Sequence, residues 1–209
     1  MHHARRANLN GMTASAPATE YPLYFRDGDG FAWSVSTRGL KLDDSGLTFT
    51  SERETRTIRF SEIRAIRLHS AFARANETPL GICTIDFGTW RTLTVFSGNS
   101  GLTADEAQRS DYHAFVRDFH RRIPQTDRAR IAFQGGLNDT RHFIVSAAML
   151  VGAAIFVVLP LVLLFIVPSL HTLGVAAASF GLAYAGWKSW QRNRPRSYSP
   201  DRIPDDLLP

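Results

Sequence analysis

The sequence predicts an α+β membrane protein in which a small antiparallel β-barrel or sandwich, closed by one helix, precedes two membrane helices. Three observations carry this prediction. No Asp, Glu, Lys or Arg occurs between His142 and Trp187. Before that stretch, short runs alternate apolar and polar residues, with turn-forming residues between them. A single segment there, residues 104–123, has the periodicity of an amphipathic helix instead.

Residues 143–167 carry the strongest single signal, an apolar run dominated by Leu, Ile, Val and Phe. A bilayer core needs about 20 consecutive helical residues, and this run is long enough to cross it. A buried core helix of about 10–14 apolar residues is the weaker interpretation. Pro160 lies inside the run and predicts a kink, because a neighbouring helix can satisfy the freed carbonyl group in lipid.

A second apolar run, residues 170–188, is rich in Ala and Gly and would insert weakly on its own. We expect it to pair with the first run as a transmembrane hairpin within residues 137–190. Ala177, Gly181 and Ala185 recur four residues apart, a spacing that permits close helix approach or homo-oligomer formation. The alternative is a single span followed by a re-entrant or interfacial segment.

Basic residues flank both runs, whereas the turn between them contains no Lys or Arg. The positive-inside rule therefore predicts an integral membrane protein whose N- and C-termini are both cytoplasmic. Residues 1–20 are small and polar, so we expect disorder and no cleavable signal peptide. Residues 191–209 are predicted to form a Pro-rich basic cytoplasmic tail.

Composition limits the partners and the chemistry. The net charge of +5 over 209 residues is modest and dispersed, which argues against nucleic acid as a partner. The single cysteine, Cys83, excludes an intramolecular disulfide and a multi-cysteine zinc site. Its place in an alternating run predicts a buried thiol rather than a nucleophile.

Residues 21–136 are predicted to form the soluble domain. Alternation and turn signals predict strands near residues 21–25, 31–37, 47–50, 58–60, 66–68, 83–87, 90–96 and 129–133. The helix predicted at residues 104–123 is expected to start at a capping box formed by Thr103 and Glu106. Its apolar stripe consists of Tyr112, Phe115, Val116, Phe119 and Ile123.

Four stretches carry a resemblance to a known family. They are the dipeptide Gly46-Leu47, IRFSEIRAIRL at 58–68, GICTIDF at 81–87 and DYHAFVRDFHRRI at 111–123. Together with the later hairpin and tail, the chain resembles bacterial membrane proteins with a pleckstrin-homology-like (PH-like) domain. The resemblance implies a cytoplasmic barrel beside an anchor in the bacterial inner membrane, and a domain that binds lipid, peptide or protein without one fixed ligand.

Candidate binding residues are few. The densest basic group, Arg56, Arg59, Arg64 and Arg67, is predicted to form a surface for a protein partner or an anionic lipid headgroup. The alternative is an ordinary solvated sheet face.

Other polar groups are less promising. His113 and His120 lie on one face of the predicted helix, where an exposed polar face is favoured over a metal site because Arg117 stands between them. Residues 97–101 could cradle an anion, although an ordinary loop is the simpler interpretation.

These observations predict a membrane-anchored interaction or scaffold module without catalytic residues, metal or cofactor. Two other classes remain open. One is an enzyme with its site at the junction of barrel and membrane, using Arg141 or His142. The other is an oligomeric pore lined by Ser146, Ser179 and Tyr184. The absence of charge within the spans argues against a transporter or a proton channel.

Overall fold

The computed structural model describes residues 17–28, 38–51, 54–71, 79–88, 91–166 and 169–208. The predicted strand at 31–37 and most of the predicted disordered segment lie outside these residues. Thr19 and Glu20, which the sequence assigned to that segment, already belong to the first strand.

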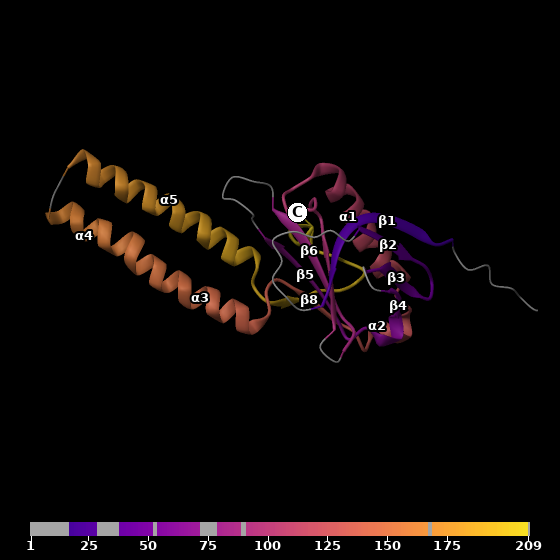
Figure 1. Ribbon diagram of the computed structural model, residues 1–209. Helices are drawn as coiled ribbons and strands as arrows, with labels where there is room; N and C mark the ends of the chain where they lie inside the picture. Colours follow the sequence, from indigo (N-terminus) through magenta and orange to yellow (C-terminus); the bar gives the residue numbers. More distant parts are fainter. Residues whose placement is uncertain are drawn as a thin grey trace, which may run out of the picture.

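Within the described residues, one nine-stranded sheet has the order β4-β3-β2-β1-β7-β6-β5-β8-β9 (Figure 1). Its strands are β1 (Thr19–Asp27), β2 (Arg38–Leu42), β3 (Gly46–Thr50), β4 (Thr55–Arg59), β5 (Ala65–Ala71), β6 (Leu80–Asp86), β7 (Thr92–Phe96), β8 (Ala132–Gly135) and β9 (Arg196–Ser197). Strands β5 and β8 run parallel, and the other neighbouring pairs are antiparallel. The predicted α+β class is confirmed at this level.

Alternating burial explains the strands that the sequence predicted. In β5, Ile66 and Leu68 are fully buried, while their neighbours along the strand are partly exposed. Strand β2 was not predicted, because Leu40 and Leu42 are its only two apolar residues and give too short an alternation. The dipeptide that begins β3 is sterically required, since a Cβ on Gly46 would lie 2.0 Å from the carbonyl oxygen of Ile58.

Helix α1 (Glu106–Arg122) closes the sheet through its predicted apolar stripe. Tyr112, Phe115, Val116 and Phe119 are completely buried. The ring of Phe115 meets Tyr21 of β1 edge-on at 5.4 Å between centroids. Each buried side chain of this size stabilises the fold by about 1.5–3 kcal/mol, so the stripe fixes the helix on the sheet.

The start of α1 differs from the prediction. Asp105 is the N-cap, and its carboxylate accepts hydrogen bonds from the backbone N–H groups of Ala107 and Gln108 at 2.9 and 3.2 Å. The capping box predicted at Thr103 is wrong, because the N–H of Thr103 donates to the side chain of Asn99 in the preceding loop. Glu106 pairs with Arg109, one helical turn further on.

The segment predicted as a separate tail lies against the sheet. Strand β9 pairs with β8, and the 3₁₀ turn η3 (Asp205–Leu207) brings Leu207 into the core at 1% exposure. A Cβ on Gly135 would lie 2.7 Å from Leu207, so a glycine in β8 makes room for this contact. The predicted strand at 129–133 starts later than expected, since the short helix α2 (Gln125–Arg128) precedes it.

A long antiparallel pair of helices projects from the sheet domain (Figure 1). Its first arm joins α3 (Asp139–Ala153), the π-helical turn η2 (Ala154–Val158) and α4 (Leu159–Ile166), and its second arm is α5 (Leu170–Arg192). The π turn directly precedes Pro160, which has no N–H to offer to the carbonyl one turn earlier.

Residues His142–Ile166 form a helix that is long and apolar enough to cross a membrane, with a mean hydropathy of 3.0. Among the described helices it is the one with that combination of length and composition; α5, richer in Ala and Gly, falls short of it. The existence of one such helix agrees with the prediction of an integral membrane protein at this coarse level.

Candidate functional site

The exposed large apolar side chains of the described residues belong to the two helical arms. Phe143 is 73% exposed, Phe165 88% and Leu170 83%, and similar side chains occur along both arms up to Trp187. In water such a surface would be unfavourable, because each exposed apolar group costs free energy in proportion to its area. Both arms therefore present a continuous apolar surface, including α5, whose mean hydropathy is the lower of the two.

The two arms are fixed to the same place on the sheet. The N–H of Gly136, just after β8, donates to the carbonyl of Leu68 at 2.8 Å, and the N–H of Leu137 donates to the carbonyl of Asn193 at 3.0 Å. A Cβ on Gly136 would lie 2.3 Å from the carbonyl oxygen of Arg194, so only glycine permits this crossing. The helical pair consequently leaves the sheet and returns to it between adjacent strands β8 and β9.

Aromatic and basic side chains gather where the helices meet the domain. The imidazole of His142 stacks on the indole of Trp190 at 5.3 Å, and the guanidinium of Arg194 lies 4.9 Å from the same ring. Trp187 lies beside Trp190, with their ring centroids 4.9 Å apart. Trp and basic residues with this arrangement are typical of the boundary between lipid and water.

Ser146 links the two arms at this end. Its hydroxyl donates to the carbonyl of His142 at 2.7 Å and accepts a hydrogen bond from the indole N–H of Trp190 at 2.8 Å. The Ser146 hydroxyl and the indole N–H of Trp190 are thereby both satisfied within the helical pair.

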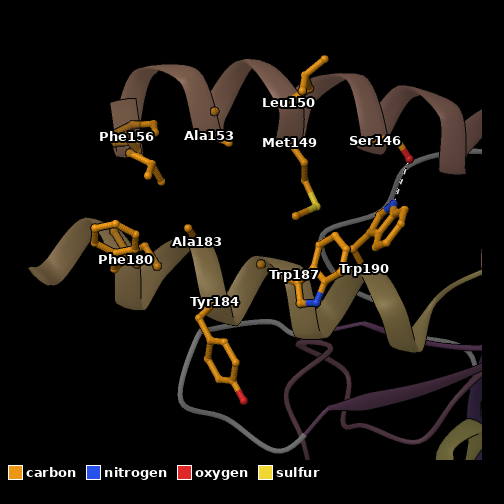
Figure 2. A pocket seen from close by; sticks show the side chains of 14 residues that line it. Ser146, Met149, Leu150, Ala153, Phe156, Phe180, Ala183, Tyr184, Trp187 and Trp190 are labelled. Carbon is orange, nitrogen blue, oxygen red and sulfur yellow. Dashed lines mark hydrogen bonds between the residues drawn. The ribbon is translucent and has the colours of Figure 1, made fainter. Parts of the chain in front are cut away.

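A cleft of about 710 Å³ separates α3 and η2 from α5 above this link. Figure 2 shows Met149, Ala153 and Phe156 on one wall, facing Phe180 and Ala183 on the other. Among the residues that line it, Tyr184 alone carries an ionisable group. This cleft between the arms is thus lined almost entirely by apolar groups.

The outer halves of the two arms pack closely. Ala176 is 4% exposed and Ser179 6%, and Pro160 of the opposite arm is buried as well. The small-residue stripe predicted from the spacing of Ala177, Gly181 and Ala185 is not the part of α5 that packs against the first arm. Ala177 and Gly181 are exposed, and nothing lies within 4 Å of a Cβ built on Gly181.

The four candidate arginines do not share one face. Arg56 and Arg59 are three residues apart in β4, so their side chains point to opposite sides of the strand. Arg56 lies 3.2 Å from the carboxylate of Glu54 and 3.9 Å from that of Asp27, whereas Arg59 is exposed. The predicted basic surface therefore does not include both Arg56 and Arg59 on one face of β4.

The remaining two arginines belong to the chain around β5. Arg67 donates a hydrogen bond to the side chain of Gln134 in β8. Arg64 is exposed at the start of β5, and its side chain covers Gly88. Arg59 and Arg64 therefore flank the 3₁₀ turn η1 (Phe60–Glu62), and we call these two arginines the basic corner.

The basic corner lies at the opposite end of β5 from the helical pair. The residues that flank the helices contact β5 at Leu68, whose carbonyl accepts from Gly136, and at Ser70, whose N–H donates to the side chain of Asn193 at 3.3 Å. Arg64 precedes Ser70 by six strand residues, a separation of about 20 Å at the usual rise of about 3.3 Å per residue. Strand β4 also lies on the far side of the domain in Figure 1.

His120 is buried, at 1% exposure, and the prediction of an exposed polar helix face is wrong for this residue. Its Nδ1 lies 2.7 Å from the carbonyl of Val116, which can only accept, so Nδ1 carries the proton. The hydroxyl of Tyr198 therefore donates to Nε2, at 2.8 Å. Burial, with a smaller contribution from the charge of Arg128, lowers the pKa of His120 to about 4, which keeps the ring neutral.

The other candidate groups take ordinary structural places. Cys83 is completely buried, as predicted, and burial raises the pKa of its thiol to about 12. In the loop at 97–101, the side chain of Asn99 accepts from the N–H groups of Gly101 and Thr103. These donors serve the loop itself rather than a bound anion. No group of three His, Cys, Asp or Glu side chains suited to a metal ion occurs among the described residues.

Comparison of the chain with protein-family models finds no match, and comparison with curated proteins finds no match either.

Proposed function

We propose that this chain is a membrane-anchored interaction module, in which a PH-like sheet domain binds a protein partner and performs no catalysis. The observation that carries the proposal is the confinement of large exposed apolar side chains to the helical pair. Exposed apolar side chains are favourable in lipid and unfavourable in water. We therefore infer that both arms are surrounded by lipid, and that α5 crosses the membrane beside the first arm as a hairpin. Strands β1 to β4 pair consecutively, as do β5 to β7, and β1 joins the two groups by pairing with β7. This antiparallel arrangement, followed by the amphipathic α1, supports the PH-like assignment.

The flanking charges orient the hairpin. Both ends of the helical pair attach to the same sheet, so the sheet domain and the C-terminal strand β9 lie on one side of the membrane. Lys188 and Arg194 lie at that end, and the chain contains no Lys or Arg between residues 143 and 187. The positive-inside rule assigns this side to the cytoplasm. The resemblance to bacterial PH-like membrane proteins makes the bacterial inner membrane the compartment.

The position of the basic corner favours a protein over a lipid as the partner of the sheet domain. Lipid headgroups of the anchoring membrane lie near Trp187 and Trp190, whereas Arg59 and Arg64 lie at the other end of the domain. At about 20 Å, the corner is beyond the screening length of about 8 Å at physiological salt. Its arginines therefore face the aqueous phase, where a soluble protein reaches them.

Strand β4 adds a second feature to this surface. Among the described residues it ends the sheet and pairs on one side only, with β3. An edge strand can accept an extended segment of another protein through its backbone groups, and flanking side chains then select the sequence. Arg59 at the end of β4 favours an acidic segment.

The test is affinity capture from detergent-solubilised membranes with the tagged full-length protein. We expect a co-purifying protein to be lost with the double variant Arg59→Glu and Arg64→Glu. The matched control is Arg117→Glu, an exposed arginine on α1, which should retain the partner. Capture that is unchanged by the double variant would remove the basic corner from the proposal. Release of the wild-type chain from membranes by alkaline carbonate would overturn the anchor.

A further inference from the structure

The cleft between the helical arms has a defined architecture. At the domain end, Trp190 and Ser146 hold α3 and α5 apart through their hydrogen bond, with the bulk of the indole between the helices. Further out, small residues on both walls leave the space open. Nothing lies within 4 Å of a Cβ built on Gly152, which lines the cleft, and Ala153 and Ala183 lie on its opposite walls (Figure 2). Phe156 and Phe180 close the outer end (Figure 2).

The length of the cleft matches one leaflet of a bilayer. From Ser146 to Phe156 the first arm advances ten residues, which is about 15 Å at 1.5 Å per residue. Half of a hydrocarbon core of about 30 Å is the same distance. Because Trp187 and Trp190 mark the headgroup level, the cleft runs from that level to the middle of the bilayer.

The volume and lining of the cleft suit a hydrocarbon chain. About 710 Å³ lies within the range of about 300–1,000 Å³ that single ligands occupy in proteins. A flexible hydrocarbon chain fits this space, and the nearly complete absence of polar groups from the walls suits it.

The charge at the open end selects the headgroup. Arg194 lies over the ring of Trp190, which lines the cleft. A phospholipid whose acyl chain enters the cleft would place its phosphate beside this cation. We propose that the cleft is a binding site for one acyl chain of an anionic phospholipid, with its headgroup bound by Arg194. This inference rests on the membrane insertion proposed above.

Native mass spectrometry of the full-length protein tests the site. The protein is incubated in detergent with equal amounts of palmitoyl-oleoyl phosphatidylglycerol, which is anionic, and the matching phosphatidylcholine, which is zwitterionic. We expect one retained lipid, with a preference for phosphatidylglycerol of about fivefold. The variant Arg194→Gln should lose this preference and still retain a lipid of either kind.

Filling the cleft provides the matched comparison. Ala183→Phe places a ring in the cleft and should lower lipid retention roughly tenfold, as overpacking does. Ala177→Phe, on the exposed side of the same helix, should leave retention unchanged. Ala153→Leu on the opposite wall repeats the test if Ala183→Phe does not accumulate in membranes.

Several outcomes would overturn the inference. They are equal retention by the cleft-filling and control variants, equal retention of the two lipids by the wild-type protein, and a dimer without bound lipid. If the wild-type protein resists alkaline carbonate extraction and still shows one of these results, the anchor stands and the lipid site falls. If carbonate releases the protein, the membrane proposal itself falls.

Discussion

The sheet domain and the helical pair place their large apolar side chains in opposite directions. In the sheet domain the large aromatic side chains point inward, and Tyr112, Phe115 and Phe119 are fully buried. In the helical pair they point outward, as the exposure of Phe143 and Phe165 shows. The difference shows that apolar content alone does not define a core. The direction of the side chains indicates which solvent surrounds each part.

Polar groups follow the same division. The ion pairs found among the described residues lie in the sheet domain and its C-terminal segment, as in the contacts of Arg122 with Asp118 and Asp44. The helical pair uses neutral hydrogen bonds. At the start of α5, Ser169 and Thr172 form a reciprocal capping box at 3.0 and 3.2 Å without any charge. Helix α1, which lies outside the bilayer, is capped by the carboxylate of Asp105.

The largest expected effect comes from truncating one phenylalanine in each region. Phe115→Ala in the sheet domain should cost about 3–5 kcal/mol of unfolding free energy, because it leaves a cavity in a packed core. Phe165→Ala at the end of α4 should leave the stability of the sheet domain unchanged, since its ring is 88% exposed. Pulse proteolysis of the full-length protein in detergent measures both. Equal losses would contradict the division into two regions.

A charge placed in each region should have the next largest effect. Leu159→Lys puts an ammonium group in the middle of the first arm and should cost about 2.5–3.5 kcal/mol of insertion. Thr57→Lys, exposed on β4, should be neutral within about 0.5 kcal/mol. The fraction of each variant that resists carbonate extraction provides the measurement. Normal insertion of the first variant would argue that this arm lies in water.

Acid should destabilise the sheet domain through His120. Its pKa falls from about 6.5 in the unfolded chain to about 4 in the fold, so the unfolded state binds the proton first. Stability from this group is complete above pH 6.5 and is lost as the pH falls toward 4, by up to about 3 kcal/mol. The unfolding free energy should depend less on pH across this range in His120→Gln, and it should keep its steep pH dependence in His113→Gln. A curve that does not change in His120→Gln would contradict a neutral buried ring.

The smallest effect separates two candidate caps of α1. Asp105→Ala should cost about 1 kcal/mol, because two backbone N–H groups lose their acceptor. Thr103→Ala should cost less, since the hydrogen bonds between Thr103 and Asn99 in the loop use the backbone of Thr103. Denaturant midpoints of the two variants give the comparison. The reverse order would restore the cap that the sequence indicated.

Local patterns predicted the elements whose stabilising contacts repeat within a few residues. The stripe on α1 and the apolar run of the first arm are of this kind, because many side chains in each element have the same kind of surroundings. Strand β2 was missed because two leucines give too little alternation. The cap at Asp105 was missed because Thr103 and Glu106 match the spacing of a capping box equally well.

Long-range contacts account for the other differences. His120 is buried because Tyr198, 78 residues later, reaches its Nε2, and no local pattern around His120 contains that information. The cleft depends on which face of α5 meets the first arm. Sequence spacing singled out Gly181, whereas the structure turns Ala183 toward the first arm. Similarly, the separation of the basic corner from the helical pair follows from the attachment of that pair at Leu68 and Ser70 of β5.

Thiol accessibility in sealed, right-side-out vesicles tests the central claim most directly. Cys83 is fully buried and should give no background, so single cysteines can be placed at Leu170, at the start of α5, and at Ser199, beyond β9 in the C-terminal segment. A membrane-impermeant maleimide should label Leu170→Cys in intact vesicles, and Ser199→Cys only after the vesicles are opened. Labelling of both positions in intact vesicles, or of neither, would contradict a hairpin that crosses the membrane twice.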